Sequence, residues 1–385
     1  MKKKLQMIVW TTLIFTLPSC DTRSYLDSQD GLEVLHLEGS PFERGVAHGK
    51  FLREEIHQTI DRWIREVEEQ FHADFHTVLA EFLESTSYQA WLKELDPDLL
   101  DEVFGMAESS GVAYGTLLAF QMSEEMMTVL EGEVRNCTVL GFCGSDSSHT
   151  LLAQNMDPPL FLHGHPFVMH VVPGNGGAEQ YIFTVPGHLG LAGMNDRGIA
   201  VTCNSISMLN HDTTGLPVVS VVRQLLSRTR LEDAVSFLKE ISFTLPQCYT
   251  LGGPEGLRCF ECSAGAMAEF YPFENRNIVL HTNYSIHNRD FNQGFIDLLA
   301  AYGKTIDDPY YCPRYFLAYD EIEDRNRHLS IRDMQDILRL EKPEIEPILN
   351  DYTLGTLVMK LDDDPALFLA LGHEKEARFH RLGFK

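Results

Sequence analysis

A cysteine stands where the sequence changes from helical to β-like character, and its thiol could act as a nucleophile. Cys137 lies in Arg135-Asn136-Cys137-Thr138-Val139, at the head of the first expected strand. A cysteine in such a place is usually a small buried hydrophobe. A thiol reacts as the thiolate, and its ordinary pKa is about 8.5. A catalytic interpretation therefore requires partner groups elsewhere in the chain.

Polar residues recur at the ends of later strands and at the start of a helix. The segments that carry them are Gln154-Asn155-Met156-Asp157, the run Gly193 to Ala200 that leads to Asn204, His281-Thr282-Asn283, and Cys312-Pro313-Arg314. Taken singly, each has an ordinary explanation. Asp157 could be a turn or cap residue, and Arg314 could form a surface pair with one of the 56 acidic residues. Asn195 is expected in a hairpin turn, outside any site.

Hydrophobic periodicity predicts two kinds of structure along the chain. Before Cys137, apolar residues recur at three and four, with no period-two alternation. The expected helices there are 42–71, 78–95, 98–110 and 114–130. After Cys137, the expected strands are 138–142, 150–154, 167–172, 180–185, 198–203, 248–251, 257–262, 268–271, 278–281, 355–361, 366–371 and 377–382. Helices are expected at 218–241, 290–302, 311–323 and 330–338. This order predicts an α+β body of two stacked antiparallel sheets covered by helices.

Composition and net charge indicate a globular protein and exclude several other classes. The chain has 385 residues, with 44% hydrophobic and 23% charged residues, as in ordinary globular proteins. Its net charge of −25 repels phosphate backbones, so no nucleic-acid partner is expected. Eight cysteines are too sparse for a disulfide scaffold.

Taken in order, these motifs resemble those of a known family. The series C-T, N-x-D, G-x-N-x-x-G-I-A-x-x-x-N, H-T-N and an arginine that opens a helix is similar to the N-terminal-nucleophile (Ntn) cysteine amidases. It looks most like the isopenicillin N acyltransferase family, with choloylglycine hydrolases and penicillin V acylases as relatives. The run Gly39 to Gly49 is similar to the opening of that family's propeptide. The resemblance covers roughly residues 32 to 385.

The resemblance implies a fold, a maturation step and a set of roles. The fold is a four-layer αββα sandwich with a helical N-terminal propeptide. Self-cleavage between Asn136 and Cys137 would free the α-amine of Cys137, whose ordinary pKa of about 7.7–8.0 suits it to act as the base. Asp157 would hold that amine, Asn283 and Asn204 would stabilise the oxyanion, and Arg314 would favour the thiolate. No cofactor or metal is implied.

Two departures from the family pattern concern specificity and maturation. Gln154 stands where choloylglycine hydrolases carry an arginine, so bile-salt specificity is not expected. Asn136 stands where the acyltransferases usually have glycine, and this bulkier residue bears on the rate of self-cleavage.

Other motifs predict little chemistry. The single Cys259-x-x-Cys262 lacks the second pair that a structural zinc site needs, so buried thiols or a disulfide partner are expected. His163 and His165 lack a third ligand at suitable spacing, and an exposed loop is the simpler interpretation. A papain-like protease is disfavoured because that class places its cysteine at the start of a helix.

The N-terminus predicts export. Lys2 to Lys4 precede a short apolar run that is too short to span a bilayer. The run ends in Leu17-Pro18-Ser19-Cys20, which resembles a bacterial lipobox, with Cys20 as the lipidated residue. An ordinary cleaved signal is the alternative. The expected division is therefore 1–20 signal, 21–136 linker and helical propeptide, and 137–385 catalytic body.

These observations predict an exported, lipid-anchored enzyme of the bacterial envelope that cleaves linear C–N amide bonds through a thioester. Water would complete hydrolysis, whereas an amine or acyl-CoA partner would make the enzyme an acyltransferase. The alternative is a non-catalytic lipoprotein that keeps the fold as a ligand-binding or scaffold module.

Overall fold

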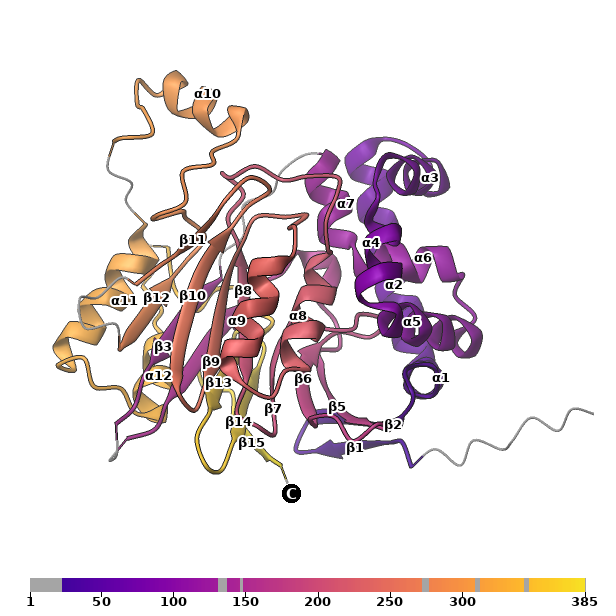
Figure 1. Ribbon diagram of the computed structural model, residues 1–385, viewed down its shortest axis with the longest axis horizontal. Helices are drawn as coiled ribbons and strands as arrows, with labels where there is room; N and C mark the ends of the chain where they lie inside the picture. The colour runs from indigo at the N-terminus through magenta and orange to yellow at the C-terminus, as the bar shows by residue number, and fades with distance from the viewer. Residues whose placement is uncertain are drawn as a thin grey trace, which may run out of the picture.

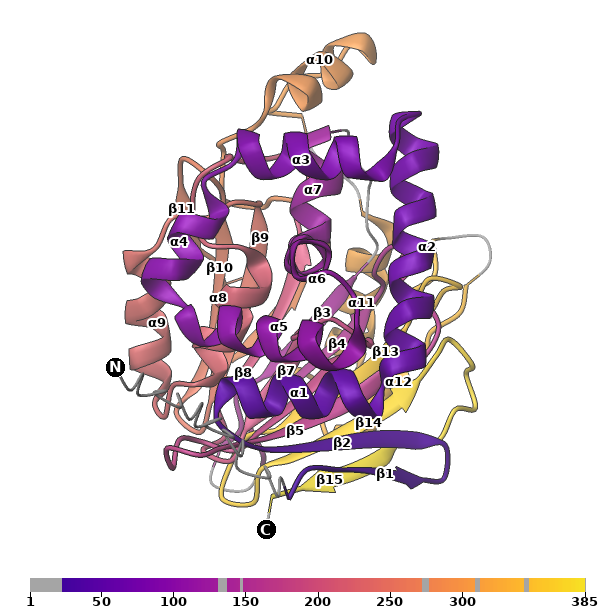
Figure 2. The same cartoon turned by 90° about the vertical axis from the view of Figure 1, so that its right-hand side faces the viewer.

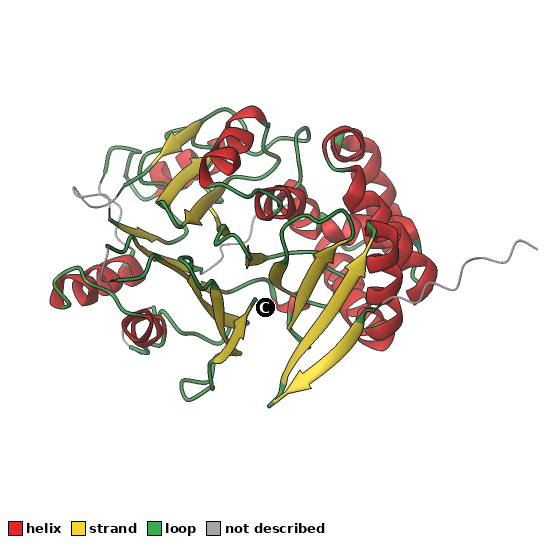
Figure 3. Ribbon diagram, turned by 60° about the horizontal axis from the view of Figure 1, so that its bottom comes forward, coloured by secondary structure: helices red, strands yellow, loops and turns green. Residues whose placement is uncertain are grey.

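Two β-sheets lie face to face at the centre of the molecule (Figures 1 and 3). The computed structural model describes residues 23–130, 137–145, 148–271, 277–308, 312–342 and 346–384. The predicted signal, Cys20 and Asn136 lie outside these ranges. Within the described ranges, no helix combines the length and apolar character needed to cross a bilayer.

The smaller sheet has six antiparallel strands. In spatial order they are β12 (Ile278–His281), β3 (Thr138–Phe142), β4 (Leu151–Met156), β13 (Gly355–Lys360), β14 (Ala366–Leu371) and β15 (His380–Gly383). Every residue of β3, β4 and β12 is buried. Continuous apolar runs such as Thr138–Phe142 suit this position because both faces of the sheet are covered.

The larger sheet has nine strands. In spatial order they are β1 (Tyr25–Gln29), β2 (Leu32–Gly39), β5 (Phe167–Pro173), β6 (Gln180–Thr184), β7 (Ala192–Asn195), β8 (Ala200–Ser205), β9 (Gln247–Gly253), β10 (Gly256–Cys262) and β11 (Met267–Glu269). All neighbours are antiparallel except β2 and β5, which run parallel. The main apolar core lies against this sheet, and a second cluster lies between the smaller sheet and its helices.

Helices cover the outer faces of both sheets. α8 (Val218–Leu226) and α9 (Leu231–Glu240) pack on the larger sheet, while α11 (Pro313–Asp324) and α12 (Ile331–Leu338) pack on the smaller one. The predicted four-layer αββα sandwich is thus the observed fold. α10 (Gln293–Ala301) stands out from the body, and none of its residues is buried (Figures 1 and 2).

The N-terminal segment is mainly helical and covers one side of the sandwich (Figure 2). Its helices are α1 (Pro41–Phe51), α2 (Arg53–Phe71), α3 (Phe75–Ser85), α4 (Tyr88–Leu95), α5 (Pro97–Ser110), α6 (Tyr114–Gln121) and α7 (Ser123–Leu130). The prediction of no strand before Cys137 was wrong, because β1 and β2 precede α1. Apolar and polar residues alternate less clearly in β2 than in an exposed strand, because β2 lies inside the sheet, between β1 and β5.

The single long helix predicted over 218–241 is two helices. α8 ends at Leu226, and the carbonyl oxygens of Leu226 and Arg228 both accept hydrogen bonds from Asn195 Nδ2, at 2.8 and 2.7 Å. Asn195 Oδ1 accepts from the N–H groups of Arg197 and Ile199. Asn195 therefore organises the β7–β8 turn, as predicted, and also holds the break between the helices, which periodicity alone does not reveal.

Close packing joins two helices of the N-terminal segment, and an ion-paired cluster connects them to the body. A Cβ added at Gly45 of α1 would lie 1.9 Å from the carbonyl oxygen of Glu102 in α5, so only glycine permits this approach. Glu102 is buried and pairs with Arg44 at 2.8 Å and with Arg223 of α8 at 2.9 Å. These two guanidinium groups lower the pKa of Glu102 to about 2 despite its burial. The ion-paired cluster therefore links α1, α5 and α8.

Gly45→Ala should destabilise the chain by about 2–3 kcal/mol, because the new methyl group forces two packed helices apart. Gly115→Ala in α6 is the matched control, since its added Cβ meets no atom within 4 Å. The control should be neutral or stabilising by up to about 1 kcal/mol. Urea unfolding of both variants measures the difference, and equal stabilities would contradict the close α1–α5 contact.

Candidate active site

The register of three neighbouring strands brings the predicted residues to one end of the smaller sheet. Thr138 of β3 pairs with Asn155 of β4, so Cys137 precedes one strand where Asp157 follows the other. His281 of β12 pairs with Val139, so Thr282 and Asn283 leave the sheet at this same end. Antiparallel pairing therefore brings Asp157 and Asn283 close to Cys137, although they lie 20 and 146 positions away in the sequence.

The Cys137 thiol is buried, with 4% of the residue exposed. Its Sγ accepts a hydrogen bond from the backbone N–H of Asp157 at 3.5 Å. Such a donor favours negative charge on the sulfur. The strand therefore directs the thiol toward the end of β4.

Arg314 lies in the interior and not at the surface, with 1% of the residue exposed. Its Nη1 donates to the carbonyl oxygen of Cys137 at 2.7 Å and to Thr138 Oγ1 at 3.1 Å. Its Nη2 donates to Asn283 Oδ1 at 3.2 Å. One rigid guanidinium therefore holds the backbone of Cys137 and the amide of Asn283 in a fixed relation.

The amide of Asn283 has a defined orientation. Oδ1 accepts from Arg314, and Nδ2 donates to the carbonyl oxygen of Ser205 at 3.0 Å. An amide nitrogen carries two hydrogens, so the second hydrogen of Nδ2 could serve an oxyanion. Ser205 enters the site through this bond and was not among the residues that sequence reasoning selected.

The hydrogen-bond donors of Asn204, at the end of β8, already have acceptors within the protein. Its Nδ2 donates to the carbonyl oxygen of Thr282 and lies 2.8 Å from His281 Nδ1. Two positions further on, Ile206 N–H donates to the Pro246 carbonyl, so ladder alternation turns the Asn204 N–H toward β9 as well. Asn204 Oδ1 is buried and has no partner within the described part of the chain.

Asp157 is a buried carboxyl group beside the thiol. Burial raises its pKa to about 7, against the opposing effects of hydrogen bonds from Asn350 and Thr353 and of the positive charge of Arg314. Asn350 Nδ2 donates to Oδ2 at 2.8 Å. Oδ1 is buried without a partner among the described residues, so this oxygen could receive a further donor.

The space around the thiol is small. Cys137, Asp157 and Asn204 line a cavity of about 30 Å³, together with Glu124 and Glu125 of α7. This volume suits one or two waters, not a substrate. Burial raises the pKa of Glu125 to about 7. Sequence reasoning did not select Glu125, because a glutamate in the helical run Ser-Glu-Glu carries no pattern that places it beside the thiol.

A much larger cavity opens on the other side of Asn283. It has a volume of about 860 Å³, within the range of small-molecule sites. Its walls are mainly apolar and aromatic, and they include Met208, Phe295, Leu299, Tyr315 and Phe316. The cavity lies between α10 and the start of α11, where Arg314 is anchored.

The Cys259-x-x-Cys262 motif lies in the buried part of β10. Cys259 and Cys262 are buried free thiols, and Cys259 Sγ lies 3.2 Å from Cys248 Sγ. Among the described residues, no group of three or more His, Cys, Asp or Glu side chains is arranged to hold a metal ion.

The four-layer arrangement, with a cysteine at the start of a central strand, agrees with the fold that the resemblance to the Ntn hydrolases implies. The family model for acyl-coenzyme A:6-aminopenicillanic acid acyl-transferase matches residues 144–296. This segment contains Asp157, Asn204 and Asn283 and begins after Cys137. The match confirms the predicted resemblance over this segment, which is less than half of the chain.

Individual relatives are distant. Two proteins of Dictyostelium discoideum, dcd1B and dcd1A, are 25% and 26% identical to this chain, over 52% and 41% of its length. The matches span 43% and 41% of those proteins, less than half of each. Penicillin V acylase from Agrobacterium tumefaciens is 16% identical over 64% of this chain and 86% of its own, with a TM-score of 0.40. A mutant conjugated bile acid hydrolase from Clostridium perfringens is 12% identical over 65% and 96%, also at 0.40.

Asp157→Asn should change the pH dependence of stability in the uncut Cys137→Ala chain. The folded carboxyl has a pKa of about 7, against about 3.9 when unfolded, so its burial destabilises the fold increasingly as the pH rises through this window. The substitution removes that penalty. Relative to the parent, the variant should gain about 3 kcal/mol of unfolding free energy between pH 5 and pH 8. Urea titrations at both pH values measure the gain, and a difference independent of pH would show that Asp157 is already ionised.

Proposed function

We propose that this protein is an N-terminal-cysteine amidohydrolase that matures by self-cleavage between Asn136 and Cys137. The observation that carries the proposal is the assembly of Cys137, Asp157, Asn283 and Arg314 around one buried thiol. Arg314 contacts both Cys137 and Asn283, as a positioning group for nucleophile and oxyanion donor would.

The burial of the thiol supports a maturation step. In the uncut chain the thiol faces a cavity of about 30 Å³, which excludes any substrate amide. The thiol would attack the carbonyl carbon of the peptide bond that precedes it, and water would hydrolyse the resulting thioester. This sequence breaks the chain and leaves Cys137 with a free α-amine.

The mature site would then work as nucleophile and base in one residue. The α-amine takes the thiol proton, and Sγ attacks the substrate carbonyl. The second hydrogen of Asn283 Nδ2 stabilises the oxyanion, which is commonly worth about 3–4 kcal/mol of barrier. The ammonium returns its proton to the leaving amine, and the unpartnered Asp157 Oδ1 accepts from that ammonium. Water hydrolyses the thioester, whereas an amine or acyl-CoA acceptor would give acyl transfer.

We further propose that the substrate carries a large apolar acyl group. The 860 Å³ cavity begins at Asn283, beside the proposed position of the scissile carbonyl, and its walls are mainly apolar. Residues 1–20 would direct export, with Cys20 as the lipid anchor.

Self-cleavage is tested by mass spectrometry under denaturing conditions. Once the signal before Cys20 is removed, the wild-type protein should give fragments of about 13 and about 28 kDa, which are the proportional shares of residues 20–136 and 137–385 in the 43.7 kDa chain, with Cys137 at the N-terminus of the larger. Cys137→Ala should stay whole. Under native conditions the wild-type fragments should remain together, because β1 and β2 complete the larger sheet. An uncut wild-type chain would contradict the proposal, and lipid mass on the small fragment would report on Cys20.

The acyl cavity is tested with fluorogenic coumarin amides of increasing acyl length. Each added methylene should raise kcat/KM about fourfold until the cavity is filled, since burial contributes about 0.8 kcal/mol per methylene. Leu299→Asp, in the wall, should abolish this gain and leave short acyl amides unaffected. Ile296→Asp, on α10 outside the wall, is the matched control. A rate that follows the length of the amine and not of the acyl group would contradict the assignment.

A further inference from the structure

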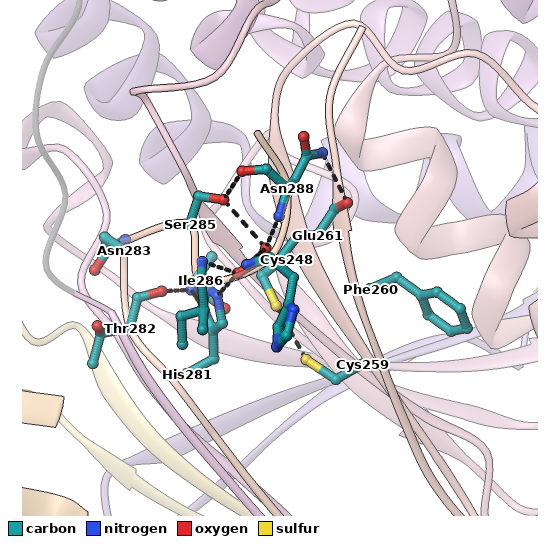
Figure 4. Close-up of polar contacts among 12 residues, drawn as sticks. Cys248, Cys259, Phe260, Glu261, His281, Thr282, Asn283, Ser285, Ile286 and Asn288 are labelled. Carbon is teal, nitrogen blue, oxygen red and sulfur yellow. Dashed lines mark hydrogen bonds and ion pairs between the residues drawn. The ribbon is translucent and has the colours of Figure 1, made fainter. Parts of the chain in front are cut away.

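Two buried ionisable residues beside the site have no role in the reaction as proposed. Glu261 lies on β10 and His281 ends β12, and both side chains are 0% exposed. Glu261 Oε1 lies 2.9 Å from His281 Nε2 (Figure 4). A buried charge is retained only where partners compensate it, so the partners of this pair indicate what it does.

Glu261 holds the segment that carries Asn283. Its carboxylate accepts from the backbone N–H groups of Ile286, His287 and Asn288, at 2.6, 2.8 and 2.6 Å. Ser285 Oγ donates to it at 3.2 Å. These bonds and His281 keep the pKa of Glu261 below its ordinary value despite burial. Together with His281, the carboxylate fixes both ends of residues 281–288, and Asn283 lies between them (Figure 4).

His281 connects the Glu261 carboxylate to the side chain of Asn204. Asn204 Nδ2 donates to the Thr282 carbonyl oxygen, which accepts only, so the nitrogen end of the amide must lie there. Despite burial, the Glu261 carboxylate raises the pKa of His281. When the ring is neutral, His281 Nδ1 accepts from the same Asn204 nitrogen, which lies 2.8 Å away. The ring then carries its proton on Nε2, where Glu261 accepts it. In this tautomer, Asn204 Oδ1 has no partner among the residues that the structure describes, and its side chain lines the Cys137 cavity.

We propose that Glu261 and His281 are positioning residues that hold the Asn204 amide with its oxygen available to the Cys137 cavity, while they fix Asn283 at its edge. The inference rests on the proposed function. Asn204 thereby offers its side-chain oxygen as a hydrogen-bond acceptor in the Cys137 cavity. It does not supply the oxyanion donor that its place in the sequence suggests. The competing explanation is an anchor that only stabilises the loop through Glu261.

Two substitutions of His281 separate these explanations. His281→Asn places an acceptor near the position of Nδ1, facing Asn204, whereas His281→Gln places a donor near Nε2, facing Glu261. If the pair acts through Asn204, self-cleavage should stay within about threefold of wild type in His281→Asn and slow about tenfold in His281→Gln, the effect of one lost hydrogen bond. The reverse ranking would overturn the inference.

Ser285→Ala is the matched control. It removes the hydrogen bonds of Ser285 Oγ to Glu261 and to the Asn288 carbonyl oxygen and leaves the contact between His281 and Asn204 intact. Its cleavage rate should match wild type. A loss as large as that of His281→Gln would assign the effect to the loop anchor and overturn the inference.

A spectroscopic measurement does not depend on cleavage. In the full Cys137→Ala chain, ¹⁵N NMR at alkaline pH should find His281 neutral, with its proton on Nε2. A proton on Nδ1 would overturn the inference directly. If wild type fails to cleave while His281 shows the expected tautomer, the proposed function fails and the positioning of Asn204 stands.

Discussion

The antiparallel register of β12, β3 and β4 is the constraint on which the site depends. A shift of one residue would turn every side chain to the other face of the sheet and separate Cys137 from Asp157. The register is held because all three strands are buried on both faces, between the larger sheet and α11 and α12. Arg314 reinforces it from α11, since its guanidinium contacts Cys137, Thr138 and Asn283 together.

The N-terminal segment is part of the same construction and not a detachable cover. β1 and β2 extend the larger sheet, and Glu102 ties α1 and α5 to Arg223 of α8. A cut before Cys137 would therefore relieve the crowding around the thiol without releasing the segment. α7 lines the thiol cavity and ends a few positions before the proposed cleavage position in the sequence.

Sequence reasoning predicted the elements whose pattern lies in consecutive residues. It missed the features that depend on contacts between residues far apart in the sequence. The bounds of β3, β12 and β14 agree with the expected 138–142, 278–281 and 366–371, because buried strands are continuous apolar runs. The break between α8 and α9 was missed because Asn195, far away in the sequence, holds it. Ser205 and Glu261 were missed for the same reason. Serine on a strand and glutamate between two cysteines carry no pattern that reveals the bonds they make.

Three buried acids near the site differ in the number of hydrogen-bond donors around them and in the direction of their pKa shifts. Glu261 is as buried as Asp157 and Glu125, yet three backbone N–H groups, a hydroxyl and an imidazole surround it, and its pKa falls. Asp157 and Glu125 each keep an oxygen without a partner among the described residues, and their pKa values rise to about 7. The fully bonded acid is thereby suited to hold a loop in place. The two incompletely bonded acids border the thiol, where a new ammonium group would form on cleavage, and that positive charge would lower the pKa of Asp157 and complete its set of donors.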